Sequence, residues 1–89
     1  MDDQTSTSSL ARIKHWHAYQ EARADIWRTR PAFDWFLRRN RARLVKAGAL
    51  VMIRGAWHVD PEVFDAEVLA IAREDAASWI DREAGKAAA

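Results

Sequence analysis

Apolar residues recur along the chain in three stretches with helical spacing, separated by two short runs of β-prone residues. The first stretch extends from about residue 9 into the mid-twenties, and the second covers about residues 32–47. The third begins at Pro61 and extends to about Arg82. Apolar positions three and four apart share one face of a helix, so each stretch predicts an amphipathic helix.

Residues at the ends of these stretches carry helix start and stop signals. Ser8 or Ser9 is placed to cap the first helix, and Pro31 suits the first turn of the second. Gly48 accepts the left-handed conformation that ends a helix. Asp60 precedes Pro61 and is placed to cap the third helix. The signals therefore agree with the boundaries that the apolar spacing predicts.

The two β-prone runs, residues 50–53 and 57–59, predict a small β-hairpin with its turn at Arg54-Gly55-Ala56. Two strands alone are marginally stable, so this hairpin must pack on the helices. Alternation within the second strand places His58 on the solvent side. The predicted fold is mainly α with one small β-hairpin.

A chain of 89 residues allows one domain. We expect residues 1–8 to be a disordered N-terminus, because they are polar and low in apolar side chains. Residues 9–84 would then form the domain with a long C-terminal helix. The last residues, 85–89, are expected to form a frayed tail.

The net charge of +1 hides a strong asymmetry along the chain. Residues 12–46 contain ten basic and three acidic side chains, a net charge of +7, whereas residues 47–89 contain four basic and eight acidic ones, a net charge of −4. This separation predicts one face for a polyanion. Five of the basic side chains fall on helix 32–47: Arg38, Arg39, Arg41, Arg43 and Lys46.

Helix 32–47 is the candidate element for reading DNA, because an α-helix fits the major groove and arginine pairs bidentately with guanine. Arg54 at the hairpin turn and His58 on its second strand are candidates for phosphate contacts. Asn40 is expected to make a structural hydrogen bond. Trp35 is expected to pack against the first helix, with contact to a sugar or phosphate as the alternative.

Other kinds of chemistry find little support in the sequence. There is no cysteine, and His15 and His17, two apart on the expected helix, would point in different directions, so no metal site is expected. No catalytic set or phosphate-binding glycine loop is present, so we expect neither an enzyme nor a cofactor or small-molecule ligand. The chain shows no signal peptide and no apolar run of membrane-spanning length, so a cytoplasmic setting is expected.

The third helix has more apolar surface than a small core can cover. Such a patch predicts self-association, as a homodimer or as an array on DNA. The alternative is that Trp79 and Ile80 fold back onto the first helix. The side chains proposed for self-association are Leu69, Ala76, Trp79 and Ile80.

Residues 33–65 resemble small winged helix-turn-helix proteins of the excisionase-like and MerR-like kind, found on phages, plasmids and integrative elements. The resemblance lies in W-F-L-R-R-N-R at 35–41, L-V-K-A-G-A-L-V at 44–51 and R-G-A-W-H-V-D-P-E-V-F at 54–64. It implies a recognition helix at 32–47 and a wing at 50–59. The function it implies is DNA binding, by a transcriptional regulator or by a recombination directionality or architectural factor. The alternative is a protein-interaction module, antitoxin-like or an adaptor subunit, whose basic face docks an acidic partner.

Overall fold

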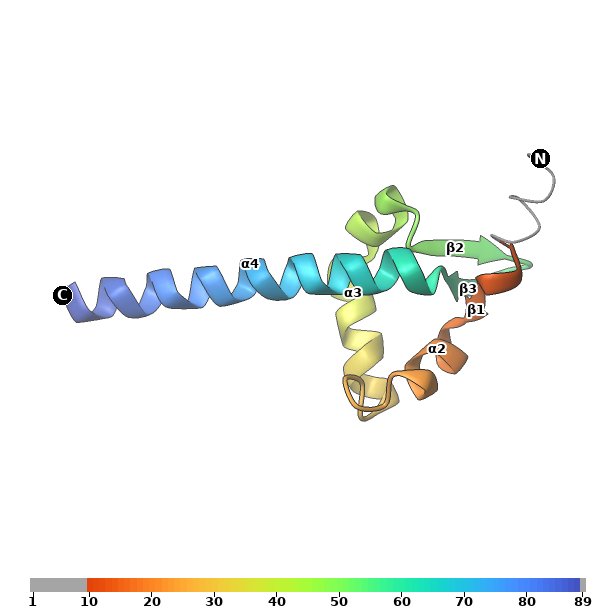
Figure 1. Cartoon of the computed structure of the whole chain (residues 1–89), viewed down its shortest axis with the longest axis horizontal. Coiled ribbons are helices and arrows are strands. Elements are labelled where there is room, and N and C mark those ends of the chain that lie inside the picture. The colour runs from red at the N-terminus through yellow and green to blue at the C-terminus, as the bar shows by residue number, and fades with distance from the viewer. Residues whose placement is uncertain (1–9, 89) are drawn as a thin grey trace.

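The computed structural model describes residues 10–88 and contains three helices and a small antiparallel sheet (Figure 1). The elements, in chain order, are β1 (Lys14–His15), α2 (Trp16–Ala22), α3 (Arg30–Ala47), β2 (Leu50–Ile53), β3 (Ala56–Val59) and α4 (Pro61–Ala88). The three strands lie in the order β1-β3-β2. The prediction of a mainly α fold with a small hairpin is confirmed. The segment expected to be disordered, 1–8, lies outside the described residues.

The prediction of one continuous first helix is wrong. A helical turn at residues 10–12 ends at Ile13, and the next two residues form strand β1, which pairs with Val59 and His58 of β3. Helix α2 begins only afterwards, and the Nδ1 of His15 accepts a hydrogen bond from the backbone N–H of His17 at 3.3 Å. Pairing with β1 satisfies the backbone groups on the free edge of β3, so a contact distant in sequence overrides the local helical spacing.

The predicted hairpin forms, with β2 and β3 in register from Leu50 opposite Val59 to Ile53 opposite Ala56. Ala56, expected in the turn, belongs to β3. Arg54 and Gly55 make the two-residue turn, with φ of 51° and 78°. Two positive φ values belong to a type I′ turn, whose twist matches that of the flanking strands. Gly48, with φ of 82°, ends α3 in the left-handed conformation.

The core is a cluster of aromatic rings to which each helix contributes. Phe33 of α3 and Phe64 of α4 are fully buried, with ring centroids 5.8 Å apart. Tyr19 of α2 lies 4.7 Å from Phe64. Trp27 packs on Phe36 at 4.7 Å and closes the side of the cluster. The three helices therefore meet at one point, where the rings are removed from water.

Gln20, which interrupts the apolar face of the first stretch, is buried. Its Nε2 donates a hydrogen bond to the backbone carbonyl of Trp27 at 2.7 Å. The amide thus satisfies a buried carbonyl and ties the segment between α2 and α3 to the core.

Two arginines from the N-terminal part of the chain hold the start of α4. Arg12 donates to both carboxylate oxygens of Asp60 at 2.9 and 3.0 Å, and Arg23 donates to Asp65 at 2.7 Å. The hydrogen bonds from these arginines hold the pKa values of both carboxyls below their usual range. Tyr19 also donates to Asp65 at 2.5 Å, and burial, followed by this hydrogen bond, raises the pKa of its phenol. These contacts fix the direction in which α4 leaves the body.

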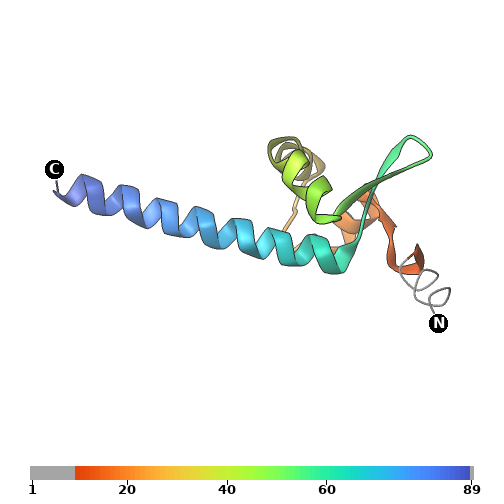
Figure 2. The same ribbon diagram turned by 90° about the horizontal axis from the view of Figure 1, so that it is seen from above.

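The C-terminal half of α4 projects from the body of the protein (Figures 1 and 2). Every side chain from Ala72 to Gly85 is exposed, and the helix continues to Ala88, beyond the end expected near Arg82. The alternative, that Trp79 and Ile80 fold back onto the first helix, is wrong, because their side chains are 53 % and 59 % exposed. The helix therefore carries apolar side chains that the body does not cover.

The carboxylate of Asp60 has two roles: it pairs with Arg12, and it accepts hydrogen bonds from the backbone N–H groups of Glu62 and Val63 at the start of α4. Two substitutions can separate these roles. Asp60→Ala removes both and is expected to lower the free energy of unfolding by about 2 kcal/mol. Asp60→Asn keeps a capping side chain and should cost less. Urea unfolding measures both, and equal losses would show that the cap contributes nothing.

The lowered pKa of Asp60 also predicts how stability depends on pH. The native carboxyl titrates below its ordinary value of 3.8, so its ionised form stabilises the fold above that value, and this contribution is lost as pH falls through the native pKa. The difference in unfolding free energy between wild type and Asp60→Asn should be constant near neutral pH and shrink below about pH 4. A difference that stays unchanged at acidic pH would contradict the pairing.

Candidate nucleic-acid interface

Helix α3 turns a basic face to solvent because its apolar residues are taken up by the core on the other side. Phe33, Leu37 and Leu44 are buried, whereas the residues between them on the far side are exposed. Four exposed cations lie on this face: Arg38, Arg39, Arg41 and Lys46. Arg30 in the first turn is also exposed, but it pairs with Glu21 at 3.5 Å. None of the four forms an ion pair within the described residues, so their charges are available to a ligand.

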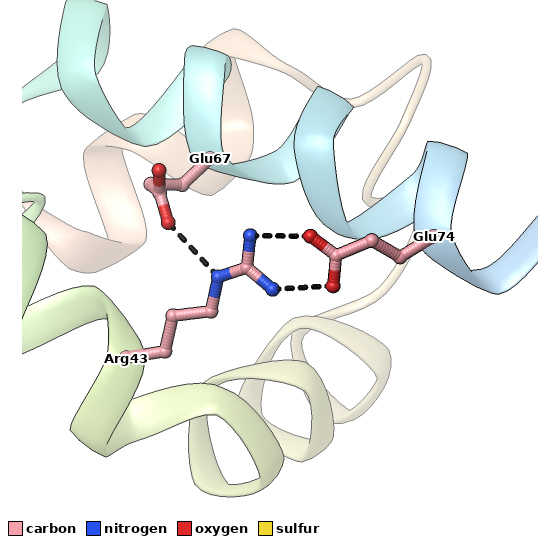
Figure 3. Close-up of polar contacts among 3 residues, drawn as sticks. All are labelled: Arg43, Glu67 and Glu74. Carbon is pink, nitrogen blue, oxygen red and sulfur yellow. Dashed lines mark hydrogen bonds and ion pairs between the residues drawn. The ribbon is translucent and has the colours of Figure 1, made fainter.

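Arg43 differs from the other cations of α3, because it is bracketed by two carboxylates of α4 (Figure 3). Its Nε donates to Glu67 at 3.0 Å, and its two terminal nitrogens donate to Glu74 at 2.7 and 2.8 Å. These bonds, first those to Glu74, raise the pKa of the Arg43 guanidinium and lower that of the Glu74 carboxyl. The sequence suggested Arg43 as a DNA ligand, but the structure uses it to link α3 to α4.

A recess lies where α3 meets the hairpin, and it has an aromatic and aliphatic lining with arginines beside it. The guanidinium of Arg41 lies over the ring of Trp57 at 5.7 Å and joins the two elements. The recess holds about 350 Å³ and is lined by Trp16, Asp34, Leu37, Arg38, Arg41, Leu50 and Trp57. A second hollow shares Arg41 and Trp57 with it and extends to Val45 and Lys46. Together they form a furrow along the hairpin side of α3.

Asp34 brings the one acidic side chain to this recess. Its Oδ1 is buried and has no hydrogen-bond partner within the described residues. A group that donates hydrogen bonds, such as the amino group of a base, would satisfy the oxygen.

The hairpin places its two candidate residues differently. Arg54 is exposed at the turn, where its side chain can reach a neighbouring surface. His58 is half-buried, with Nδ1 2.9 Å from the carbonyl oxygen of Ala56 and its ring 5.5 Å from that of His15. His58 therefore lies over the sheet beside β1, away from the tip.

The histidines of β1 and α2 lie closer together than the sequence suggested. His15 and His17 were expected to point apart on one helix, but their rings meet edge to face at 5.2 Å, because His15 belongs to a strand. Within residues 10–88 no group of three or more His, Cys, Asp or Glu side chains is arranged to hold a metal ion.

Trp35 belongs to the exposed surface of α3 and does not pack against the first helix, so that expectation is wrong. Its side chain is 57 % exposed, and the guanidinium of Arg39 lies 4.9 Å from the ring centroid. The spacing of four residues between Trp35 and Arg39 was a signal for this pair. Asn40 makes the expected structural hydrogen bond, from its side-chain nitrogen to the carbonyl of Phe36 at 3.0 Å.

Comparisons with protein-family models, with curated proteins and with solved structures find no match to this chain. Among the described residues, no helix has both the length and the apolar character needed to cross a membrane.

The ion pairs of Arg43 with Glu67 and Glu74 predict that Arg43 stabilises the fold, whereas Arg38, which has no ion pair in the described residues, does not. Arg43→Ala should lower the free energy of unfolding measurably, because it leaves Glu67 and Glu74 without their shared cation. Arg38→Ala, the same change at an exposed position of the same helix, should leave stability unchanged. Denaturant unfolding measures both, and equal stabilities of the two variants would contradict this prediction.

Proposed function

We propose that this protein binds duplex DNA, with α3 in the major groove and the turn between β2 and β3 against the neighbouring backbone. In this proposal it is a winged helix-turn-helix protein of a mobile element. It acts there as a transcriptional regulator or as an architectural or directionality factor in recombination. The observation that carries the proposal is the exposed basic face of α3 beside the hairpin.

The face offers both kinds of contact that duplex DNA needs. Arg38, Arg41 and Lys46 form no ion pair within the described residues, so their charges are not neutralised by a carboxylate of the protein. Contacts to phosphate fix register, and contacts to base edges supply sequence preference. Trp35 adds an exposed ring next to these cations.

The order of elements agrees with this proposal. Helices α2 and α3 follow one another around the aromatic cluster, and α3 ends directly before the hairpin. The preceding strand, β1, pairs with the second strand of the hairpin, so the hairpin is held against the helix pair. The same sheet therefore fixes the position of the turn that carries Arg54.

The distribution of charge defines which side of the protein meets DNA. Helix α4 contains seven acidic and three basic side chains, and two of the acidic ones are occupied by Arg43. On its projecting half the three other acidic side chains are matched by three basic ones, so this part of the helix offers phosphates no excess of positive charge. The basic side of α3 is therefore the side that a nucleic acid approaches.

A second candidate is a protein-interaction module that docks an acidic partner. It is favoured by two apolar side chains at this surface, Val45 and Met52, which are 46 % and 53 % exposed. Interfaces between proteins have an apolar centre with a charged rim, and these residues lie near the arginines of α3. Binding of duplex DNA in a salt-dependent manner separates the two candidates.

The proposal predicts salt-dependent binding to duplex DNA that depends on α3. Binding should weaken steeply as salt rises, because contacted phosphates release counterions. Each of Arg38→Ala and Arg41→Ala should cost about 1–3 kcal/mol of binding free energy if that side chain contacts a base edge. Arg54→Ala should instead weaken binding to all sequences alike. Fluorescence anisotropy over a salt series measures these effects.

Arg73→Ala provides the matched control, because Arg73 is an exposed arginine on the opposite side of α4 from the core. Its affinity for DNA should equal that of wild type. Folded protein that does not bind duplex DNA at low salt would end the proposal and favour the protein-interaction module. Equal losses in Arg38→Ala and Arg73→Ala would show that α3 is not the contacting element.

A further inference from the structure

The projecting half of α4 buries no side chain in the body, although Glu74 at its start pairs with Arg43 of α3. Asp75, Trp79 and Arg82 line an open hollow that faces α3. Ile71 is its last buried residue, and every side chain from Ala72 to Gly85 is exposed. An isolated helix of this length is marginal in water, since most helical stability in proteins comes from packing of an apolar face. This part of α4 therefore needs a partner, and its surface indicates which partner fits.

The apolar side chains of this segment follow a heptad spacing. Alternate steps of three and four residues place Leu69, Ala72, Ala76 and Trp79 along one seam, with Ile80 beside it. Such a seam is typical of helices that pair at a shallow angle. Asp75 and Arg82, seven residues apart, occupy equivalent positions along one edge of the seam. Neither forms an ion pair within the part of the chain that the structure describes.

We propose that a second copy of this chain covers the seam, with the two α4 helices antiparallel and the twofold axis between residues 77 and 78. The inference stands on α4 alone and goes beyond DNA binding, which it does not require. It makes the expected homodimer specific by naming the direction and the register of the pair.

Side-chain size selects the antiparallel direction. In the proposed register each Trp79 lies opposite Ala76 of the second copy, so a large ring meets a small residue at both layers. A parallel pair in register would place Trp79 against Trp79 and Ala76 against Ala76, crowding one layer and leaving a void in the other. Close packing disfavours both defects.

Charge selects the same arrangement. The antiparallel register places Asp75 beside Arg82 of the second copy, and the twofold axis repeats this pair at the other end. A parallel pair would instead place Asp75 beside Ile80. Flanking positions of paired helices set partner choice and orientation through such ion pairs. Opposite charges therefore meet along the edge of the seam only when the two helices are antiparallel.

The length of the seam limits the strength of the dimer. From Leu69 to Trp79 it spans about 15 Å at 1.5 Å per residue. A contact of this length is smaller than a standard protein interface, so we expect dissociation in the micromolar range. Sedimentation of the full chain without DNA is therefore a suitable measurement, and its outcome is separate from that of the DNA-binding experiment.

Charge reversal tests the pairing. Asp75→Arg places two arginines opposite each other in its homodimer, and Arg82→Asp places two aspartates opposite each other. Each variant alone should dimerise about tenfold or more weakly than wild type. An equimolar mixture should regain dimers, because the mixed pair restores an arginine opposite an aspartate at both ends. Asp81→Arg, on the far side of the helix from the seam, is the control and should dimerise like wild type.

Recovery in the mixture supports the antiparallel register, because a parallel pair does not bring residues 75 and 82 together. A wild-type chain that stays monomeric at high micromolar concentration would overturn the inference. If both charge-reversal variants dimerise as strongly as wild type, the register is wrong. The register is also wrong if the mixture contains no more dimer than either variant alone. Trp79→Ala should also reduce dimerisation, and circular dichroism and unfolding of each variant verify that the body remains folded.

Discussion

The packing of Phe64 against Phe33 and Tyr19 is the contact on which the rest of this structure depends. A domain this small has one core, and these rings bring α2, α3 and α4 to a single meeting point. Because Phe33 faces inward, the opposite side of α3 faces solvent with its arginines. Because Phe64 lies in the first turns of α4, the remainder of that helix extends past the core. The basic surface and the projecting helix are therefore two results of one packing arrangement.

The arginines of the chain divide into those that hold the fold and those that remain available. Arg12, Arg23 and Arg43 each bind carboxylates of the Asp60–Glu74 segment, so they connect the N-terminal half to α4. Arg38, Arg39, Arg41 and Lys46 of α3 form no ion pair within the described residues. The net charge of +7 therefore overstates the positive charge that a polyanion would meet, because Arg12, Arg23 and Arg43 are paired with carboxylates. The acidic residues that pair with them are at the end of the hairpin and on α4, so the two halves of the chain hold each other in place.

Local signals in the sequence predicted most of the framework, since each is decided by neighbouring residues. Gly48, the Arg54-Gly55 turn and Asp60-Pro61 stand where α3 ends, the hairpin turns and α4 begins. Features that depend on distant residues were missed. Strand β1 forms because β3, more than forty residues later, offers an edge. Arg43 was assigned to DNA because its partners, Glu67 and Glu74, come from another helix. DNA binding itself stays a prediction.

The length of the exposed part of α4 would also set the distance between the two bodies of the proposed pair. In the antiparallel pair that we propose, Glu67 would mark where α3 is attached to α4 in each copy, and about 10 residues would separate it from the twofold axis. At 1.5 Å per residue the two attachment points lie about 32 Å apart, close to one turn of B-DNA. Each residue inserted between them and the axis would rotate a body by about 100° as well as displace it. Changes of about seven or eleven residues return each body close to its original orientation, so the geometry of the proposed pair would restrict the length of this helix to discrete steps.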